Sequence, residues 1–445
     1  MYRRRAGRCG DGGDWRGRRA HLVAWTGRAR RRAAAESGRP LVGGGVMRRS
    51  GNEWNVRFFG WAAVIVVKVV VVVAFHLWSL STGRGGLAPV VVGGGDDGEY
   101  YLAVAEQIAN TGATPLFVTS VWPVVVAELM RVTGWPGVLV FKLLLLSASL
   151  GTAVVGVRLL RMLTADVYRA RAGAAAEVQL AALLTLFPST LWVSSYSIYR
   201  DAVIYFFVMV SVYGVYRWLV RGDRRALVAF SLAMWGLIAF RWYAAVTVGA
   251  GALLWMLLSR GRPETLVKRR LAAVAVLSAA VGVVVASGQM SFFTNALSSR
   301  DLFESTGAGS NLGLSYSGSS VFVWPAIYLY TFATNVLGPL PNQIDGATTL
   351  AGFVLEVPLL AFCLWRVIRS PLSRTGPALL LLAVASVWFM LIAIYNDNVG
   401  TGLRLRVVGY QLVFVVVASD LAVARVRARA QRRRRRGARA RPVHA

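Results

Sequence analysis

The chain has 445 residues, of which 56% are apolar and 16% charged, and its mean hydropathy is +0.54. A soluble protein of this length needs more polar surface, so a soluble enzyme is excluded. The net charge of +30 is concentrated at the ends: 15 of the 50 Lys and Arg residues lie in 1–58 and 10 lie in 425–445. Basic tails that flank apolar runs indicate topology signals and contacts with anionic lipids, not a nucleic-acid site.

Residues 1–58 predict a basic, disordered cytoplasmic arm, because they lack the compact apolar run of a signal peptide. Three glycines, Gly43 to Gly45, stand just before Met47. One hypothesis is that translation begins at Met47, so that 1–46 is not translated; the alternative is that the whole arm belongs to the protein. At the other end, 425–445 predicts an Arg-rich cytoplasmic tail.

Long apolar runs between 59 and 424 predict an all-α, polytopic helical membrane protein. Ten segments are predicted spans: 59–80, 136–158, 178–197, 201–219, 226–240, 242–258, 271–288, 350–368, 376–395 and 406–424. The pair 226–240 and 242–258 is short for a hydrocarbon core about 30 Å thick, so we expect an outward hairpin that turns near Arg241. Two further stretches, 116–130 and 321–338, each contain a proline, and we expect them to be external interfacial helices.

The positive-inside rule favours this arrangement. Ten crossings with both termini inside place 41 basic residues inside and 7 outside, with Lys68 and Lys142 within spans; if both proline-containing stretches crossed, the division would be 32 to 16. The external segments are then 81–135, 289–349 and 396–405.

Lys68 lies deep in the first predicted span and has no evident acidic partner in the sequence. We therefore expect its amine to reach the inner surface along its aliphatic stem. His76 is the only histidine away from the tails, which argues against a His-based metal centre or a Ser-His-Asp triad. No P-loop, GxGxxG or CxxC motif is present, so cytosolic nucleotide chemistry has no support.

The first external loop contains three closely spaced carboxylates, Asp96, Asp97 and Glu99, which follow a run of glycines and begin a predicted interfacial helix over 99–110. A carboxylate at a helix N-terminus stays ionised, which suits a general base or a metal ligand. The alternative is that Asp96 and Asp97 only cap this helix.

The pattern Asp97-x-x-x-Tyr101-x-x-x-Ala105, which ends in Asn110-Thr111-Gly112, resembles the first-loop signature of GT-C integral-membrane glycosyltransferases. The protein-mannosyltransferase and aminoarabinose-transferase types and related bacterial polysaccharide-assembly proteins are the nearest comparison. The resemblance implies that Asp97 is the catalytic base for an acceptor hydroxyl and that the donor is a sugar on a polyprenyl-phosphate carrier. A shifted alignment gives this role to Asp96.

Two outer helix ends carry arginines that can bind a lipid-linked phosphate, since a guanidinium fork matches phosphate oxygens. Tyr199-Arg200-Asp201 resembles a stretch of bacterial polysaccharide-assembly proteins, and its alternative role is an Arg–Asp turn that anchors two helices. Arg241, beside Trp242-Tyr243, is either an interfacial anchor or a second phosphate-facing cation.

Arg404 and Arg406 form a basic pair at an outer helix end, against the orientation rule, so they need an anionic partner. The stretch resembles the Arg-x-Arg start of the last helices in GT-C and polysaccharide-polymerase proteins. A spacing of two places the arginines on different faces of a helix, so both contact one ligand only where the backbone is irregular. The alternative is structural pairing with Asp397.

Together with these features, the GT-C resemblance implies a glycosyltransferase at the outer face of a bacterial plasma membrane. It would move a sugar from a polyprenyl-phosphate carrier to a glycan, lipid or protein acceptor in cell-envelope assembly. Candidate substrate-binding residues are Tyr101, Glu99, Arg200, Asp201, Arg241, Arg404 and Arg406. No cofactor is required, although the external carboxylates are compatible with a divalent cation. The rivals are a polysaccharide polymerase or ligase and, with less support from the charge pattern, a transporter or flippase.

Overall fold

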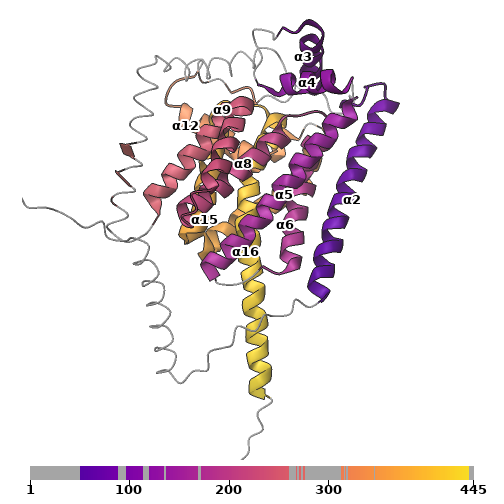
Figure 1. Ribbon diagram of the computed structural model, residues 1–445. Helices are drawn as coiled ribbons and strands as arrows, with labels where there is room; N and C mark the ends of the chain where they lie inside the picture. The colour runs from indigo at the N-terminus through magenta and orange to yellow at the C-terminus, as the bar shows by residue number, and fades with distance from the viewer. Residues whose placement is uncertain are drawn as a thin grey trace, which may run out of the picture. The chain divides into compact units, whose positions relative to one another are not determined.

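The computed structural model describes residues 51–88, 97–113, 120–134, 137–168, 172–259, 312–314, 319–344 and 346–439, with isolated positions between 267 and 316. Within these ranges the chain is helical and contains no strand (Figure 1). Residues 1–50, Asp96 and most of the predicted span 271–288 lie outside the described residues, so the predictions made for them stay predictions. Residues 51–58 of the predicted disordered arm are instead the first turns of a helix.

The helices follow the predicted order. Their bounds are α2 (Gly51–Ser81), α3 (Asp97–Thr111), α4 (Trp122–Thr133), α5 (Val138–Tyr168), α6 (Ala174–Leu186), α7 (Pro188–Ser195), α8 (Asp201–Val215), α9 (Ala226–Leu258), α12 (Trp324–Leu337), α13 (Ala347–Leu355), α14 (Val357–Arg369), α15 (Gly376–Tyr395) and α16 (Val399–Arg439). Within the described part of the chain, seven helical stretches are long and apolar enough to cross a membrane, and the bent pair α6–α7 makes an eighth. The prediction of a multi-pass helical membrane protein is confirmed at this level.

Hydrogen bonds and ion pairs define the two ends of this bundle. At one end, here called the loop end, α4 lies over the connections between helices: the Trp122 indole donates to Ile198 O at 2.8 Å and the Val121 amide to Ala239 O at 3.2 Å. At the other end, here called the basic end, Arg57 of α2 pairs with Glu177 of α6 at 2.7 Å. Arg425 of α16 donates to Gln179 at 2.7 Å, so the start of α2 and the far half of α16 lie at the same end.

Arg241 breaks α9 into two limbs, since its backbone (φ −164°, ψ 87°) is extended where the flanking residues are helical. The first limb packs along α8, with Gly214 so close to Phe230 that an added Cβ would lie 2.9 Å from the Phe230 Cβ. The second limb runs along α15 toward the basic end. Tyr243 stacks on Tyr395, and the Trp255 indole donates to Gly376 O. Arg241 therefore sits at a turn at the loop end, where the predicted hairpin placed it.

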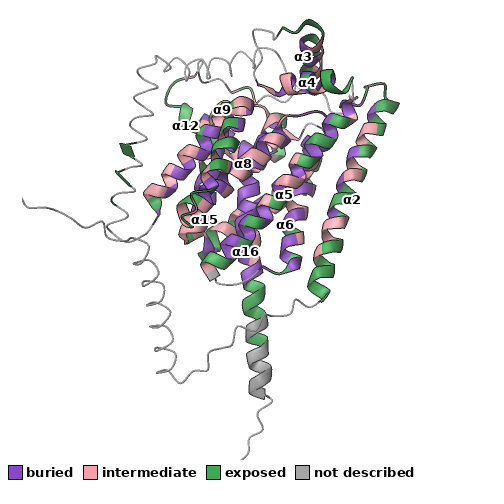
Figure 2. Ribbon diagram, in the orientation of Figure 1, coloured by how far each residue is buried: buried purple, intermediate pink, exposed green. Residues whose placement is uncertain are grey.

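α16 is the central helix and α2 the peripheral one. In the apolar part of α16, 83% of residues are buried inside the protein, against 17% in α2 (Figure 2). Val407, Phe414 and Val416 are fully buried, whereas the face of α2 around Val66 and Val70 is exposed, as it would be toward lipid. The part of α16 from Leu405 to Val417 is thus enclosed by the surrounding helices.

The prediction for Lys68 is wrong. Its side chain is fully buried, and its Nζ donates to Thr185 O at 2.7 Å and to Ser194 Oγ at 2.6 Å. Pro188 separates α6 from α7 with a bend of 56°, which leaves the Thr185 carbonyl without its usual helical partner. Lys68 satisfies this carbonyl in the apolar interior, where no water can, so the amine does not extend to the surface.

The two proline-containing stretches form short helices, as expected. α4 has 12 residues and α12 has 14, and neither is among the helices long enough to span a membrane. α12 reaches the loop end, since the Asn335 amide donates to Asn396 O at 2.9 Å. Both helices begin with proline near the first position, where the missing N–H disturbs no hydrogen bond.

Candidate functional site

An ion pair joins the first-loop helix to the last long helix. Asp97, in the first turn of α3, accepts from the guanidinium of Arg404 on α16 at 2.7 Å. The Asp97 side chain is 46% exposed and that of Arg404 is 17% exposed. Because the pair is open to solvent on the carboxylate side, Asp97 can leave Arg404 without entering an apolar environment.

A second carboxylate lies beneath the first pair. Asp201, at the first position of α8, pairs with Arg241 at 2.9 Å and lies 3.9 Å from Arg404. Its side chain is only 5% exposed. Arg404 is therefore shared between a buried carboxylate and an exposed one.

Tyrosine rings support each of the arginines. Arg200 lies over Tyr101 at 5.6 Å from the ring centre, Arg404 over Tyr199 at 4.7 Å, and Arg241 over Tyr243 at 5.3 Å. These distances are within the range of cation–π attraction. Burial raises the pKa of Tyr101 to about 12, so this phenol stays neutral at physiological pH and its ring remains a suitable surface for the guanidinium.

We call this set the arginine cluster; it comprises Asp97, Tyr101, Tyr199, Arg200, Asp201, Arg241, Tyr243 and Arg404. It contains three guanidinium groups and two carboxylates, so it carries an excess of positive charge. Arginines that are partly screened from solvent and lie beside an exposed carboxylate suit a phosphate or diphosphate, which accepts several charge-assisted hydrogen bonds at once.

Local structure explains why these residues meet. Asp201 is the first residue of α8, at the loop end. The break in α9 brings Arg241 to the same end. Arg404 lies five residues after the start of α16 at Val399. The Tyr205 hydroxyl donates to Arg404 O at 2.6 Å and fixes the backbone of α16 against α8. The backbone around Arg404 is already regular helix.

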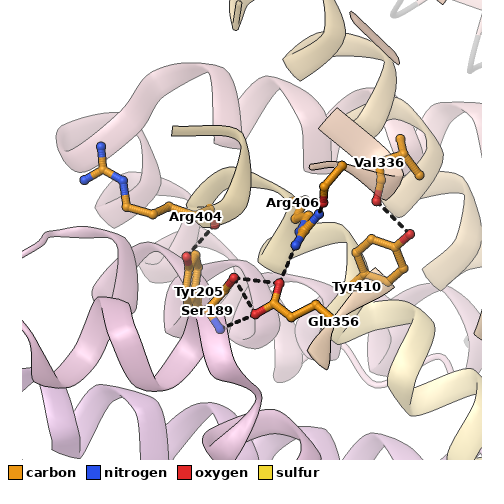
Figure 3. A network of polar contacts seen from close by, with 8 residues as sticks. Ser189, Tyr205, Val336, Glu356, Arg404, Arg406 and Tyr410 are labelled. Carbon is orange, nitrogen blue, oxygen red and sulfur yellow. Dashed lines mark hydrogen bonds and ion pairs between the residues drawn. The ribbon is translucent and has the colours of Figure 1, made fainter. Parts of the chain in front are cut away.

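Arg406 does not join the arginine cluster. Because two residues on a helix differ by roughly 200° in direction, Arg406 points to the opposite side of α16 from Arg404. Its guanidinium pairs with Glu356, between α13 and α14, and donates to Gly338 O at the end of α12 (Figure 3). Arg406 is 1% exposed and Glu356 2% exposed, so the pair is closed to solvent.

Six of the predicted site residues come together in the arginine cluster, namely Asp97, Tyr101, Arg200, Asp201, Arg241 and Arg404. Glu99 instead pairs with Arg84 at the edge of the loop end. The predicted alternative that joined Arg404 and Arg406 to Asp397 is not what is seen, since their ion pairs go to Asp97, Asp201 and Glu356.

Sequence reasoning did not select Tyr205, Glu356 and Ser189. A signal was available for Glu356, since an acid one residue before Val357-Pro358 within a predicted span is an intramembrane charge that needs a partner. No sequence pattern connected it with Arg406 or Ser189. The contact of Glu356 with both residues depends on how three helix ends pack together, which the sequence alone does not show.

No three His, Cys, Asp and Glu side chains lie together as metal ligands in the part of the chain that the structure describes. Comparisons of the chain with models of known protein families, with curated proteins and with solved structures give no match.

Proposed function

We propose that this protein is a membrane glycosyltransferase that moves a sugar from a polyprenyl-phosphate carrier to an acceptor hydroxyl. The observation that carries the proposal is the Asp97–Arg404 ion pair at 2.7 Å beside Asp201 and Arg241. It puts a carboxylate that suits a general base within reach of arginines that suit a phosphate. The GT-C resemblance of the first loop implies the same role for Asp97 and a lipid-linked donor.

In the proposed reaction, the carrier phosphate binds Arg404, with Arg200 and Arg241 nearby, and takes the place of Asp97. The freed carboxylate accepts the proton of the acceptor hydroxyl as that oxygen forms a bond to the anomeric carbon. The bond between the anomeric carbon and the phosphate oxygen breaks, and its electron pair stays on the phosphate. The guanidinium groups stabilise the charge that develops there.

The proposed topology has ten crossings: α2, α5, α6 with α7, α8, the two limbs of α9, 271–288, the segment 349–369, α15 and α16. Both termini are then cytoplasmic, the basic tails contact anionic lipids, and the arginine cluster faces the outside of a bacterial plasma membrane. A lipid-linked donor follows from this sidedness, because nucleotide sugars are cytosolic.

Sugar transfer in membranes from cells that make the protein tests the reaction. Asp97→Asn and Asp96→Asn are compared separately with Glu99→Gln, whose carboxylate pairs with Arg84 outside the cluster. We expect Asp97→Asn to lose transfer by about 100-fold or more, as for removal of a general base, and Glu99→Gln to retain it. If Asp97→Asn stays active and Asp96→Asn does not, the base is Asp96; activity in both supports a polymerase or ligase.

The sidedness has its own test. Single cysteines at Gln107 on α3 and Arg224 at the basic end, both exposed, are introduced after Cys9 and Cys363 are replaced by serine and alanine. A membrane-impermeant maleimide applied to intact cells is expected to label Gln107→Cys and to label Arg224→Cys only after lysis. The opposite pattern contradicts an external site.

A further inference from the structure

The arginine cluster is assembled from two arms that are distant in sequence. One arm is the α7–α8 segment, which carries Tyr199, Arg200 and Asp201; the other is the start of α16, which carries Arg404. The Tyr205–Arg404 O hydrogen bond is one link between them. A second link lies deeper, and it passes through Glu356.

Glu356 binds the start of the first arm. At the Pro188 break, the Ser189 amide lies free of the α6 ladder and donates to Glu356 Oε1 at 2.5 Å. The Ser189 hydroxyl contacts both carboxylate oxygens, at 2.7 and 2.9 Å. A carboxylate at the first turn of a helix is favourable, so Glu356 acts as a distant cap for α7.

Arg406 binds the second arm to the same carboxylate. Its other contact, Gly338 O, is a carbonyl at the end of α12, where the helix offers no further donor. The chain Ser189–Glu356–Arg406–Gly338 thus satisfies the ends of two helices in a part of the interior that is closed to solvent, and it crosses from α7 to α16 (Figure 3). We refer to it as the Glu356 bridge.

We propose that Glu356 is a positioning residue: through Ser189 and Arg406 it sets the depth and rotation of α16 against α7, and thereby places Arg404 opposite Asp97 and Asp201. The geometry supports this because Arg406 is half a turn from Arg404 on the same rigid helix, so a rotation that moves one must move the other. The inference rests on the proposed function for its ligand, an isoprenyl phosphate at Arg404, but its first test needs no ligand.

The first test measures whether position 404 faces position 97. Asp97→Cys and Arg404→Cys are joined by a short bis-maleimide in a background without Cys9 and Cys363. The Glu356 bridge is removed by Glu356→Leu with Arg406→Leu, which leaves no unpaired buried charge. We expect the rate of cross-linking to fall by about ten-fold, in line with the sensitivity of site geometry to displacements of about 1 Å.

Two controls separate position from folding. A cysteine pair at Arg57 and Glu177, at the basic end, should cross-link equally fast with and without the Glu356 bridge. A matched variant, Arg366→Leu with Asp420→Leu, removes a different ion pair between α14 and α16, also at the basic end, and should leave the 97–404 rate unchanged. Equal 97–404 rates with and without the Glu356 bridge would overturn the proposal.

The second test asks whether Glu356 acts through Arg404. Binding of farnesyl phosphate is measured for the wild type, the bridge variant, Arg404→Ala and the combination. We expect the bridge variant to bind about ten-fold more weakly, and to have no further effect once Arg404 is absent. Additive losses would overturn the positioning role and leave the proposed function in place, whereas wild-type protein that does not bind farnesyl phosphate would contradict the proposed function itself.

If the bridge variant does not fold, Ser189→Ala takes its place in both tests. It removes only the hydroxyl contacts to Glu356 and keeps the charges paired. The expected changes are then about three-fold, in the same direction and equally dependent on Arg404, and their absence would overturn the proposal.

Discussion

Arg404 and Arg406 are the same kind of residue, two positions apart on one helix, yet they occupy opposite kinds of environment. Arg404 has one buried carboxylate and one that is 46% exposed, while Arg406 has a partner that is 2% exposed. The first arrangement allows a partner to be exchanged for a ligand. The second allows no exchange, because an unpaired charge at that depth is strongly destabilising. This difference supports the proposal that the arginine cluster binds a phosphate, whereas the Glu356 bridge joins helix ends.

The largest effect should come from breaking the closed pair on one side. Glu356→Ala leaves Arg406 charged and unpaired in the interior, so we expect a loss of about 3–5 kcal/mol in stability. Thermal unfolding of the purified protein, or its yield from membranes, measures this. Unchanged stability in Glu356→Ala would contradict the view that the Arg406–Glu356 pair cannot be broken without a large cost.

Arg404→Ala should have the opposite profile. We expect farnesyl phosphate to bind about 100-fold more weakly, while the unfolding temperature changes little because Asp97 becomes solvated and Asp201 keeps Arg241. Arg404→Lys keeps the charge but not the planar fork, and should recover only part of the affinity. A large loss of stability in Arg404→Ala would remove the distinction between the two arginines.

Asp97→Asn tests whether the exposed carboxylate is exchanged. If the carrier phosphate displaces Asp97 from Arg404, then removing the competing charge should strengthen farnesyl phosphate binding by about three- to ten-fold while sugar transfer is lost. Titration calorimetry and the membrane transfer assay measure the two quantities. Weaker binding in Asp97→Asn would show that Asp97 and the phosphate do not compete.

Glu99→Gln should give the smallest effect. The Arg84–Glu99 pair lies at the edge of the loop end with side chains 33% and 42% exposed, so its removal should change stability by less than about 1 kcal/mol. Binding of farnesyl phosphate should stay within two-fold of wild type. Since Glu99 is two residues from Asp97, this variant also shows whether the effect of Asp97 is specific to its carboxylate.

The sequence predicts the helical class and both ends of α15, because apolar runs and prolines act locally. The helices α2, α5 and α16 extend beyond their predicted spans, since polar residues continue these helices past the apolar runs. The turn at Arg241 is a good example of a local pattern: two runs too short to span separately, with a charge between them, predict the break that α9 contains. The meeting of Asp97, Arg200 and Arg404 follows from charges at predicted helix ends on one side of a membrane. Local sequence patterns are therefore sufficient for the turn at Arg241 and for grouping these three charged residues.

The Glu356 bridge could not be predicted in this way. The Pro188 break separates the Ser189 amide from the Thr185 carbonyl, and the structure gives each of these two groups a charged partner, Glu356 and Lys68. The sequence marks the break but not which distant side chain satisfies it. For Lys68 the absence of an acid nearby suggested a path to the surface, whereas the true partner is a backbone carbonyl.

The loose placement of α2 has a consequence for how the protein responds to lipid. Two polar anchors, Arg57 and Lys68, tie this 31-residue helix to α6 and α7. Apolar contacts add to them, with Gly60 close to Val178 and Phe75 packed on Trp192. The exposed rings of Trp54 and Trp78 lie toward its two ends. A helix of this length measures about 46 Å, more than a hydrocarbon core of about 30 Å requires. We therefore expect a change in bilayer thickness to be absorbed as tilt of α2 about the Lys68 anchor, which leaves the interior helices undisturbed.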